Sequence, residues 1–242
     1  MPDWCVMSAS TPSVSICIPA YEMHGEGCVM LDRLVTSILD QDYKDVEIVV
    51  SDHSISSDIE RLCSVYPSVK YVRNANSRGS SSANINNAIK HSVGHYIKPM
   101  FQDEAFYSTH ALSAMVEGIE SSKKNWVVCE CLCYKDDIEK TFNHFKPKWL
   151  SEQDLIAGTN TIGPPSSIMY KNNSGIIFDE KMIWLMDCDF YCRLYRQTGY
   201  PGFISEVCVL VRAWEGSVSN SVITEDLRLE EHKYITKKYA GV

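Results

Sequence analysis

Apolar runs alternate with segments of helical spacing through about the first 130 residues of the chain. We expect buried strands at the apolar runs 13–20 (SVSICIPA), 46–52 (VEIVVSD), 69–74 (VKYVRN) and 95–101 (HYIKPMF). The apolar residues of the segments between them recur at helical spacing, which predicts helices at 28–41, 57–66 and 80–93. Such alternation predicts an α/β fold in which helices cover both faces of a parallel sheet.

The second half of the chain is less regular. We expect a helix around 108–122 and a strand at 126–134, which continue the layer, and then a loop-rich, aromatic segment at 142–167. A helix at 184–199 and a strand at 203–212 follow, and the charged last stretch predicts a peripheral helix at about 221–242. No repeat or linker interrupts the chain, so we expect a single domain over 1–242.

Composition and charge narrow the class of protein. The chain has 45% hydrophobic and 22% charged residues and a net charge of −8, and an acidic protein is a poor general partner for nucleic acid or anionic membranes. No apolar run reaches the ~18 residues of a membrane-spanning helix. Residues 1–13 lack the positively charged region and the apolar region of an export signal. We therefore expect a cytoplasmic protein with no integral membrane segment and no nucleic-acid partner.

Ten cysteines raise the question of a metal site or disulfides. Cys129, Cys131 and Cys133 alternate at strand spacing, so they face one side of a strand and would splay along it as zinc ligands. Cys188 and Cys192 are four residues apart on a predicted helix, where packing explains them. We expect neither a structural zinc ion nor a disulfide.

Carboxylates gather at the ends of predicted elements: Asp52, then Asp103 with Glu104, then Asp187 with Asp189. Ligands of parallel sheets bind at the carboxyl ends of the strands, and clustered carboxylates with no close basic residue suit Mg²⁺ or Mn²⁺. Each could instead be a solvated loop charge or a helix cap. The chain has no GxGxxG after its first strand, no GxxxxGK[ST] and no GxSxG, which disfavours dehydrogenases, P-loop enzymes and α/β-hydrolases.

Four segments together resemble the inverting glycosyltransferases of family 2: VSICIPAYE, VEIVVSDHS, NSRGSSSANINNAIKHSVGHYIKPMFQDE and MDCDFYCRL. The resemblance extends from about Ser13 to Ser219. It implies a GT-A fold, with a Rossmann-like, mostly parallel central sheet flanked by helices on both faces. It also implies a nucleotide-binding half at about 13–104 and an acceptor-side half at about 105–220.

The resemblance further implies a donor-binding set of nine residues: Pro19, Ala20, Tyr21, Glu22, Asp52, Arg78, Asn84, Gln102 and Asp103. Within this set, Tyr21 would stack on the base and Asp52 would accept a hydrogen bond from the uracil N–H. Arg78 and Asn84 would contact the base or order the adjoining loop.

Metal binding and catalysis are implied in the same way. Asp103 resembles the last acid of the D-x-D motif, which with Glu104 in support would hold Mn²⁺ or Mg²⁺ between the donor's two phosphates. Asp187 takes the place of the general base. The chain departs from the family pattern at Phe101, where the first acid of D-x-D usually stands, and at Trp214, where a histidine metal ligand often stands.

The function implied is metal-dependent, inverting transfer of a sugar from a nucleotide-diphosphate donor, with a UDP-sugar favoured, to a glycan or other hydroxyl acceptor. One alternative is a catalytically weak or inactive module that only binds nucleotide sugars, since the two departures weaken the metal site. A second is a nucleotidyltransferase, which would normally have a glycine-rich, basic loop after its first strand. The loop PAYEMHGEG is acidic instead.

Overall fold

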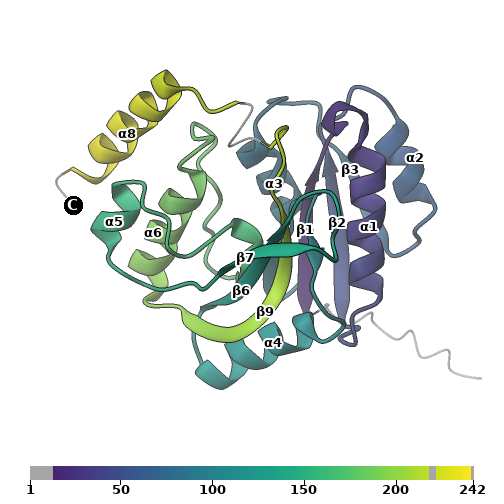
Figure 1. Ribbon diagram of the computed structural model, residues 1–242, viewed down its shortest axis with the longest axis horizontal. Helices are drawn as coiled ribbons and strands as arrows, with labels where there is room; N and C mark the ends of the chain where they lie inside the picture. The colour runs from purple at the N-terminus through teal and green to yellow at the C-terminus, as the bar shows by residue number, and fades with distance from the viewer. Residues whose placement is uncertain (1–12, 218–221, 241–242) are drawn as a thin grey trace, which may run out of the picture.

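The computed structural model describes residues 13–217 and 222–240, and in them nine strands form one sheet with helices on both sides (Figure 1). The strands are β1 (Val14–Ala20), β2 (Val46–Asp52), β3 (Val69–Arg73), β4 (Tyr96–Pro99), β5 (Ala105–Phe106), β6 (Trp126–Tyr134), β7 (Thr141–Phe145), β8 (Ile168–Lys171) and β9 (Gly202–Arg212). The helices are α1 (Gly27–Leu39), α2 (Asp58–Ser64), α3 (Ser81–Lys90), α4 (Ala111–Ser122), α5 (Glu152–Ile156), α6 (Met186–Thr198) and α8 (Glu225–Tyr239), with short 3₁₀ turns at Met23–Gly25 and Pro165–Ser167.

The first four strands form the parallel part of the sheet. Their order is β3-β2-β1-β4, and β1 pairs in parallel with both β2 and β4. This arrangement confirms the strands and connecting helices predicted for the first hundred residues. The runs of β1, β2 and β4 were readable because these strands are largely buried on both faces, whereas β3 is a half-exposed edge strand in which apolar residues alternate with Lys70 and Arg73.

The second half of the sheet is mixed, with the order β4-β8-β6-β9-β5. β7 pairs with the carboxyl-terminal part of β6. β8 lies antiparallel between β4 and β6, so the predicted strand 126–134 does not lie directly beside β4. The prediction of loop for 142–167 is wrong in part, because β7 and α5 lie there. β7 is largely exposed and β8 is only four residues long, so neither produces a clear apolar pattern.

Two apolar cores lie on opposite faces of the sheet. The α1-side core contains Ile16 and Ile18 of β1 with side chains from α1, α2 and α4. The α3-side core contains Cys17 of β1 with side chains from α3, α5, α6 and α8. Cys129 and Cys131 both lie in the α1-side core, on one face of β6 as predicted. The nine cysteines in the described part of the chain are free thiols.

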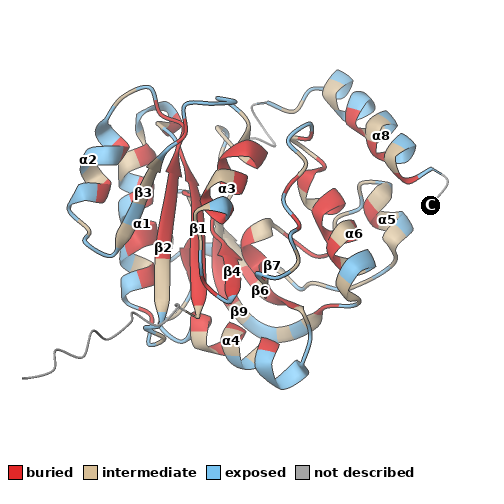
Figure 2. Ribbon diagram, turned by 180° about the vertical axis from the view of Figure 1, so that it is seen from behind, coloured by how far each residue is buried: buried red, intermediate tan, exposed pale blue. Residues whose placement is uncertain are grey.

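The predicted terminal helix is present as α8, but it is more than a peripheral helix. Glu231, Ile235 and Tyr239 form a buried face, and the last two belong to the α3-side core (Figure 2). Residues 221, 241 and 242 of the predicted helix lie outside the described residues, as do residues 1–12, where we expected no export signal. Among the described helices, none has the length and apolar character needed to cross a bilayer.

Gly94 joins α3 to β4 where β1 passes very close. Its N–H donates to Ser15 Oγ at 2.8 Å, and a Cβ atom at this position would lie 2.5 Å from that oxygen and 2.7 Å from the Ser15 nitrogen. The second contact is with backbone of a central strand, which cannot move without disturbing the sheet. The close approach of these segments therefore requires glycine.

We expect Gly94→Ala to lower the free energy of unfolding by ~1–3 kcal/mol, the usual cost of overpacking a tight interior. Urea denaturation would show a lower midpoint with little change in slope. Val93→Ala is the matched control, because Val93 is 57% exposed, and its effect should stay within about 0.5 kcal/mol. Equal stabilities of the two variants would contradict this reading of the Gly94 contact.

Candidate functional site

The carboxyl ends of the parallel strands bring together several of the predicted donor-binding residues. The register pairs Ala20 at the end of β1 with Asp52 at the end of β2. Asn84 of α3 donates to the Ala20 carbonyl at 3.0 Å and accepts the Ser51 hydroxyl at 2.6 Å. Pro19 and Ala20 are themselves buried within β1. Asn84 therefore joins α3 to both strand ends and orders this edge of the sheet.

Side-chain hydrogen bonds attach the loop after β1 to two other loops. Gln102 accepts the Tyr21 N–H at 2.9 Å and donates to the Gly27 carbonyl at 2.6 Å. Glu22 accepts the Ser56 N–H at 3.2 Å, which ties the loop after β1 to the loop after β2. Tyr21 remains 37% exposed, so its ring is accessible to a ligand. Gln102 and Glu22 thus fix the position of the loop after β1, which carries Tyr21.

Asp52 is fully buried and already hydrogen-bonded. One carboxylate oxygen accepts the Ser54 N–H at 2.7 Å, and the other accepts the Tyr71 hydroxyl at 2.8 Å and the Arg73 guanidinium at 2.5 Å. An incoming base N–H would have to share this carboxylate with these donors. Arg78 is exposed in the loop before α3. The base contacts of Asp52 and Arg78 stay predictions.

Asp103 lies half-buried after β4. Its Oδ2 accepts the Trp214 indole N–H at 2.9 Å, and its backbone carbonyl accepts the Tyr134 hydroxyl at 2.7 Å and the Arg33 guanidinium at 3.0 Å. Burial raises the pKa of Asp103, while the Trp214 hydrogen bond and the charges of Arg212 and Arg33 oppose that rise. Trp214 therefore holds one carboxylate oxygen of Asp103 by a side-chain hydrogen bond.

Glu104 points into the protein. It is 4% exposed, its Oε2 accepts the Phe101 N–H at 2.9 Å, and the fully buried Lys98 is its nearby opposite charge. Lys98 donates to the Ser166 carbonyl and lies 5.7 Å from the centre of the Phe106 ring. Burial raises the pKa of Glu104 and lowers that of Lys98. A metal contact from Glu104, which stays a prediction, would require it to leave these surroundings.

Asp103 has the chemistry for a metal site that the donor completes. In residues 13–217 and 222–240, no three His, Cys, Asp or Glu side chains converge to hold an ion. One carboxylate oxygen is nevertheless sufficient protein contact for Mg²⁺ or Mn²⁺ when phosphate oxygens and water supply the remaining ligands. The Asp103 oxygen that Trp214 does not occupy fits that role.

Asp187 lies in the first turn of α6 with its carboxylate held from two sides. Oδ2 accepts the Asn160 side-chain N–H at 2.6 Å, and Oδ1 accepts the Cys188 N–H at 2.7 Å. Burial raises the pKa of Asp187 to about 6, against the lowering effect of these two hydrogen bonds. A positioned carboxylate with a pKa close to neutrality is suited to take a proton from an acceptor hydroxyl.

Hydrogen bonds join α3 to the start of α6, the turn that carries this carboxylate. Ser82 of α3 donates to the Met182 carbonyl at 2.8 Å and touches the Met186 sulfur at 3.4 Å. The same helix α3 carries Asn84, which bonds to the end of β1. The Asp187 turn and the end of β1 are therefore both attached to α3, although they are far apart in sequence.

Asp189 is the other acid of the same turn, and its surroundings are those of a structural residue. It is fully buried, pairs with Arg193 and with Lys238 at 2.7 Å each, and accepts the Tyr239 hydroxyl at 2.9 Å. Its oxygens are therefore fully engaged within the protein. Of the two acids that the sequence offers, Asp187 has the more accessible position.

Two residues that contact the predicted acids were missed. Arg73 is in register with Asp52 across the β2–β3 pair, and a basic residue at the end of the predicted strand 69–74 was a usable signal. Asn160 also accepts the N–H groups of Ile162 and Gly163 at 3.0 and 2.9 Å, so its amide both shapes a loop and holds Asp187. Nothing in the local sequence pattern distinguished Asn160.

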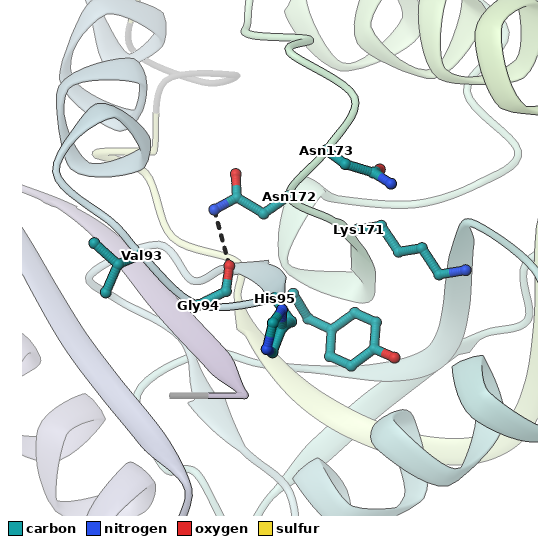
Figure 3. Close-up of a pocket in the computed structure, with 7 residues that line it drawn as sticks. Val93, Gly94, His95, Lys171, Asn172 and Asn173 are labelled. Carbon is teal, nitrogen blue, oxygen red and sulfur yellow. Dashed lines mark hydrogen bonds between the residues drawn. The ribbon is translucent and has the colours of Figure 1, made fainter. Parts of the chain in front are cut away.

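A surface cavity of about 430 Å³ lies away from this edge (Figure 3). Its walls are residues 93–96, at the amino end of β4, and residues 171–173, which follow β8. Asn172 closes one side by donating to the Gly94 carbonyl at 2.9 Å. None of the predicted site residues lines it, so it is separate from the candidate site.

Comparison with known proteins agrees with this geometry. The sequence model described as "Glycosyl transferase family 2" matches residues 15–200. A Campylobacter jejuni protein named GalNAc(5)-diNAcBac-PP-undecaprenol beta-1,3-glucosyltransferase is 28% identical over 137 residues, which cover 54% of this chain and 42% of the relative. The chain thus spans less than half the length of that relative.

Solved structures share the fold. S. aureus TarS 1-349 in complex with UDP-GlcNAc has a TM-score of 0.74 and 15% identity, over 93% of this chain and 66% of that one. The mannosyltransferase PcManGT from Pyrobaculum calidifontis, in complex with GDP-Man and Mn²⁺, has a TM-score of 0.58 and 17% identity, over 85% and 57% of the two chains. These likenesses confirm the predicted GT-A fold, with its central sheet between layers of helices.

We expect Lys98→Met to lower the free energy of unfolding by ~1–3 kcal/mol, because it leaves the buried Ser166 carbonyl without its donor and removes the positive charge near Glu104. The double variant Lys98→Met/Glu104→Gln also removes the ionisable group of Glu104 and should recover the part of that loss that comes from the interaction of the two side chains. Chemical denaturation of both variants would measure the difference, with Lys90→Met on the exposed side of α3 as control. A double variant as unstable as the single one would rule out an interaction between the two charges.

Proposed function

The chain belongs to glycosyl transferase family 2, and we propose that it is an inverting glycosyltransferase that takes its sugar from a nucleotide-diphosphate donor. The observation that carries this proposal is the state of Asp187. Its carboxylate is oriented by Asn160 and has a pKa raised to about 6, while the neighbouring Asp189 is committed to ion pairs. A general base needs both a fixed position and a pKa near the working pH.

The proposed reaction is a single displacement. Asp187 takes the proton of an acceptor hydroxyl as that oxygen bonds to the anomeric carbon of the sugar. The bond from this carbon to the donor's diphosphate breaks on the opposite face, and the diphosphate leaves with the electron pair, which inverts the anomeric centre. Asp103 would hold Mn²⁺ or Mg²⁺, whose chemistry is to neutralise the charge of the leaving diphosphate.

We propose a UDP-sugar as the preferred donor. Structures with this fold have been solved with UDP-GlcNAc, UDP and GDP-Man, which supports a nucleotide-diphosphate sugar in general. The preference for uridine rests on Asp52, whose remaining acceptor capacity suits the uracil N–H, and on the accessible ring of Tyr21. A base without that N–H would lack this additional hydrogen bond to a charged acceptor, at a cost of about 1.5–3 kcal/mol.

We propose a carbohydrate hydroxyl as the acceptor and one domain with two functional halves. The Campylobacter jejuni relative is named for a glucosyl transfer to a lipid-linked glycan, which supports a glycan acceptor in general.

The two proposed halves of the domain have different roles. Residues of about 13–104 would bind the nucleotide. Residues of about 105–220 would bind the acceptor, since Asp187 and the Asn160 loop belong to that half.

The first test is nucleotide release from a panel of UDP- and GDP-sugars in the presence of Mn²⁺. We expect the highest rate with a UDP-sugar, and we expect kcat/KM to rise with pH through about 6, because only the ionised Asp187 accepts a proton.

Asp187→Asn should lower kcat by ~10²-fold or more and remove this pH dependence, with donor binding and melting temperature nearly unchanged. The exposed Asp136→Asn serves as control. Retained turnover in Asp187→Asn would exclude Asp187 as the base.

The metal proposal is tested by calorimetry rather than activity. Wild-type protein should bind UDP more tightly with Mn²⁺ than without it, and should bind Mn²⁺ alone weakly, because Asp103 offers one free oxygen. In Asp103→Asn, which keeps the shape and removes the charge, the increment from Mn²⁺ should disappear while metal-free UDP binding remains. An unchanged increment would show that Asp103 does not hold the ion.

A further inference from the structure

Glu231 of α8 is a buried carboxylate that binds three backbone N–H groups of one short segment. It is 3% exposed, its Oε1 accepts the Ile183 N–H at 2.7 Å, and its Oε2 accepts the N–H groups of Trp184 and Leu185 at 3.0 and 2.8 Å. Hydrogen bonds to an ionised acceptor are roughly twice as strong as neutral ones. The path of residues 183–185 is therefore determined from α8.

This segment leads directly into the turn that carries Asp187. Leu185 is the N-cap residue of α6 and makes no side-chain cap hydrogen bond. A leucine cannot satisfy the free N–H groups at a helix start, a task that Ser, Thr, Asp or Asn usually performs. Glu231, which belongs to a distant helix, instead binds the N–H groups of residues 183–185, the segment that leads into α6. Asp187 lies two residues beyond Leu185.

A second contact joins α8 to the same turn on the other side of Asp187. Lys238 and Tyr239 bind the Asp189 carboxylate at 2.7 and 2.9 Å. The proposed base is thus flanked in sequence by two attachments to α8, Glu231 before it and Asp189 after it. Glu231 lies outside the 15–200 segment that the family model matches.

We propose that α8 is a positioning element for the transfer reaction, in which Glu231 holds residues 183–185 so that the Asp187 carboxylate meets the acceptor hydroxyl. Glu231 acts through the start of α6 and touches neither donor nor acceptor. This inference rests on the proposed function of Asp187. It assigns a role in turnover, as distinct from donor binding, to a helix that follows every strand of the sheet.

Glu231→Gln tests the inference with almost no change in size. The glutamine side chain keeps one oxygen, but its NH₂ group must face a backbone N–H, so at least one of the three hydrogen bonds is lost. Glu230→Gln is the matched control, because Glu230 is an exposed acid on the same helix. The measurements are kcat and donor KM for nucleotide release, the melting temperature, and amide hydrogen exchange of the peptide 182–190.

We expect Glu231→Gln to lower kcat by at least ~10-fold with donor KM within about two-fold of wild type, and to speed exchange in 182–190. Glu231→Asp, which keeps the charge, should recover part of the rate, and Glu230→Gln should behave as wild type. A wild-type kcat in Glu231→Gln would overturn the inference and leave the proposed function intact. A parallel loss of kcat, donor affinity and melting temperature would overturn it in favour of a purely stabilising role. If wild-type protein releases no nucleotide from any donor, the proposed function itself fails and the inference falls with it.

Discussion

Backbone polar groups at the edge of a sheet must find hydrogen-bond partners, and that requirement determines how this site is built. Unpaired buried N–H and C=O groups are costly, and loops at strand ends have no neighbouring strand to satisfy them. Here side chains do so: Gln102 for the loop after β1, Asn84 for the end of β1, Asn160 for its own loop and Glu231 for the start of α6. Three of these side chains, Gln102, Asn84 and Glu231, come from other segments, so they also join the separate loops of the site.

The same stretch of chain supplies one carboxylate to the site and one to the interior. Asp103 meets Trp214 at the candidate site, whereas Glu104 bonds to the backbone of its own turn near the buried Lys98. The two acids stand in the turn after β4 and have different partners, so the acidic pair in the sequence does not form one binding site. One acid is left for a metal, and the ion would depend on the donor for most of its ligands.

The parts of the fold that were predictable are those with a local signal. β1, β2 and β4 were identified because strands buried on both faces are largely apolar, and the edge strand β3 kept enough apolar residues to be recognised. The exposed β7 and the four-residue β8 lack such a pattern. In the site, the family resemblance pointed to Asp187, but the pairing of Asp189 with the distant Lys238 and the contact of Asn160 with Asp187 gave no local signal. Local patterns indicate which residues lie at strand ends, but partners that fold in from distant segments decide what each acid can do.

The place of α8 in the chain order has a consequence for how the protein matures. During synthesis, the strands and loops of the nucleotide side are made long before Glu231 and Lys238, which bind on either side of Asp187. A nascent chain could therefore complete the Asn84 and Gln102 contacts while the start of α6 still lacked its partners. If Asp187 and α8 act as proposed, donor binding and transfer would then be acquired at separate times, and a partly made chain would lack the positioned base.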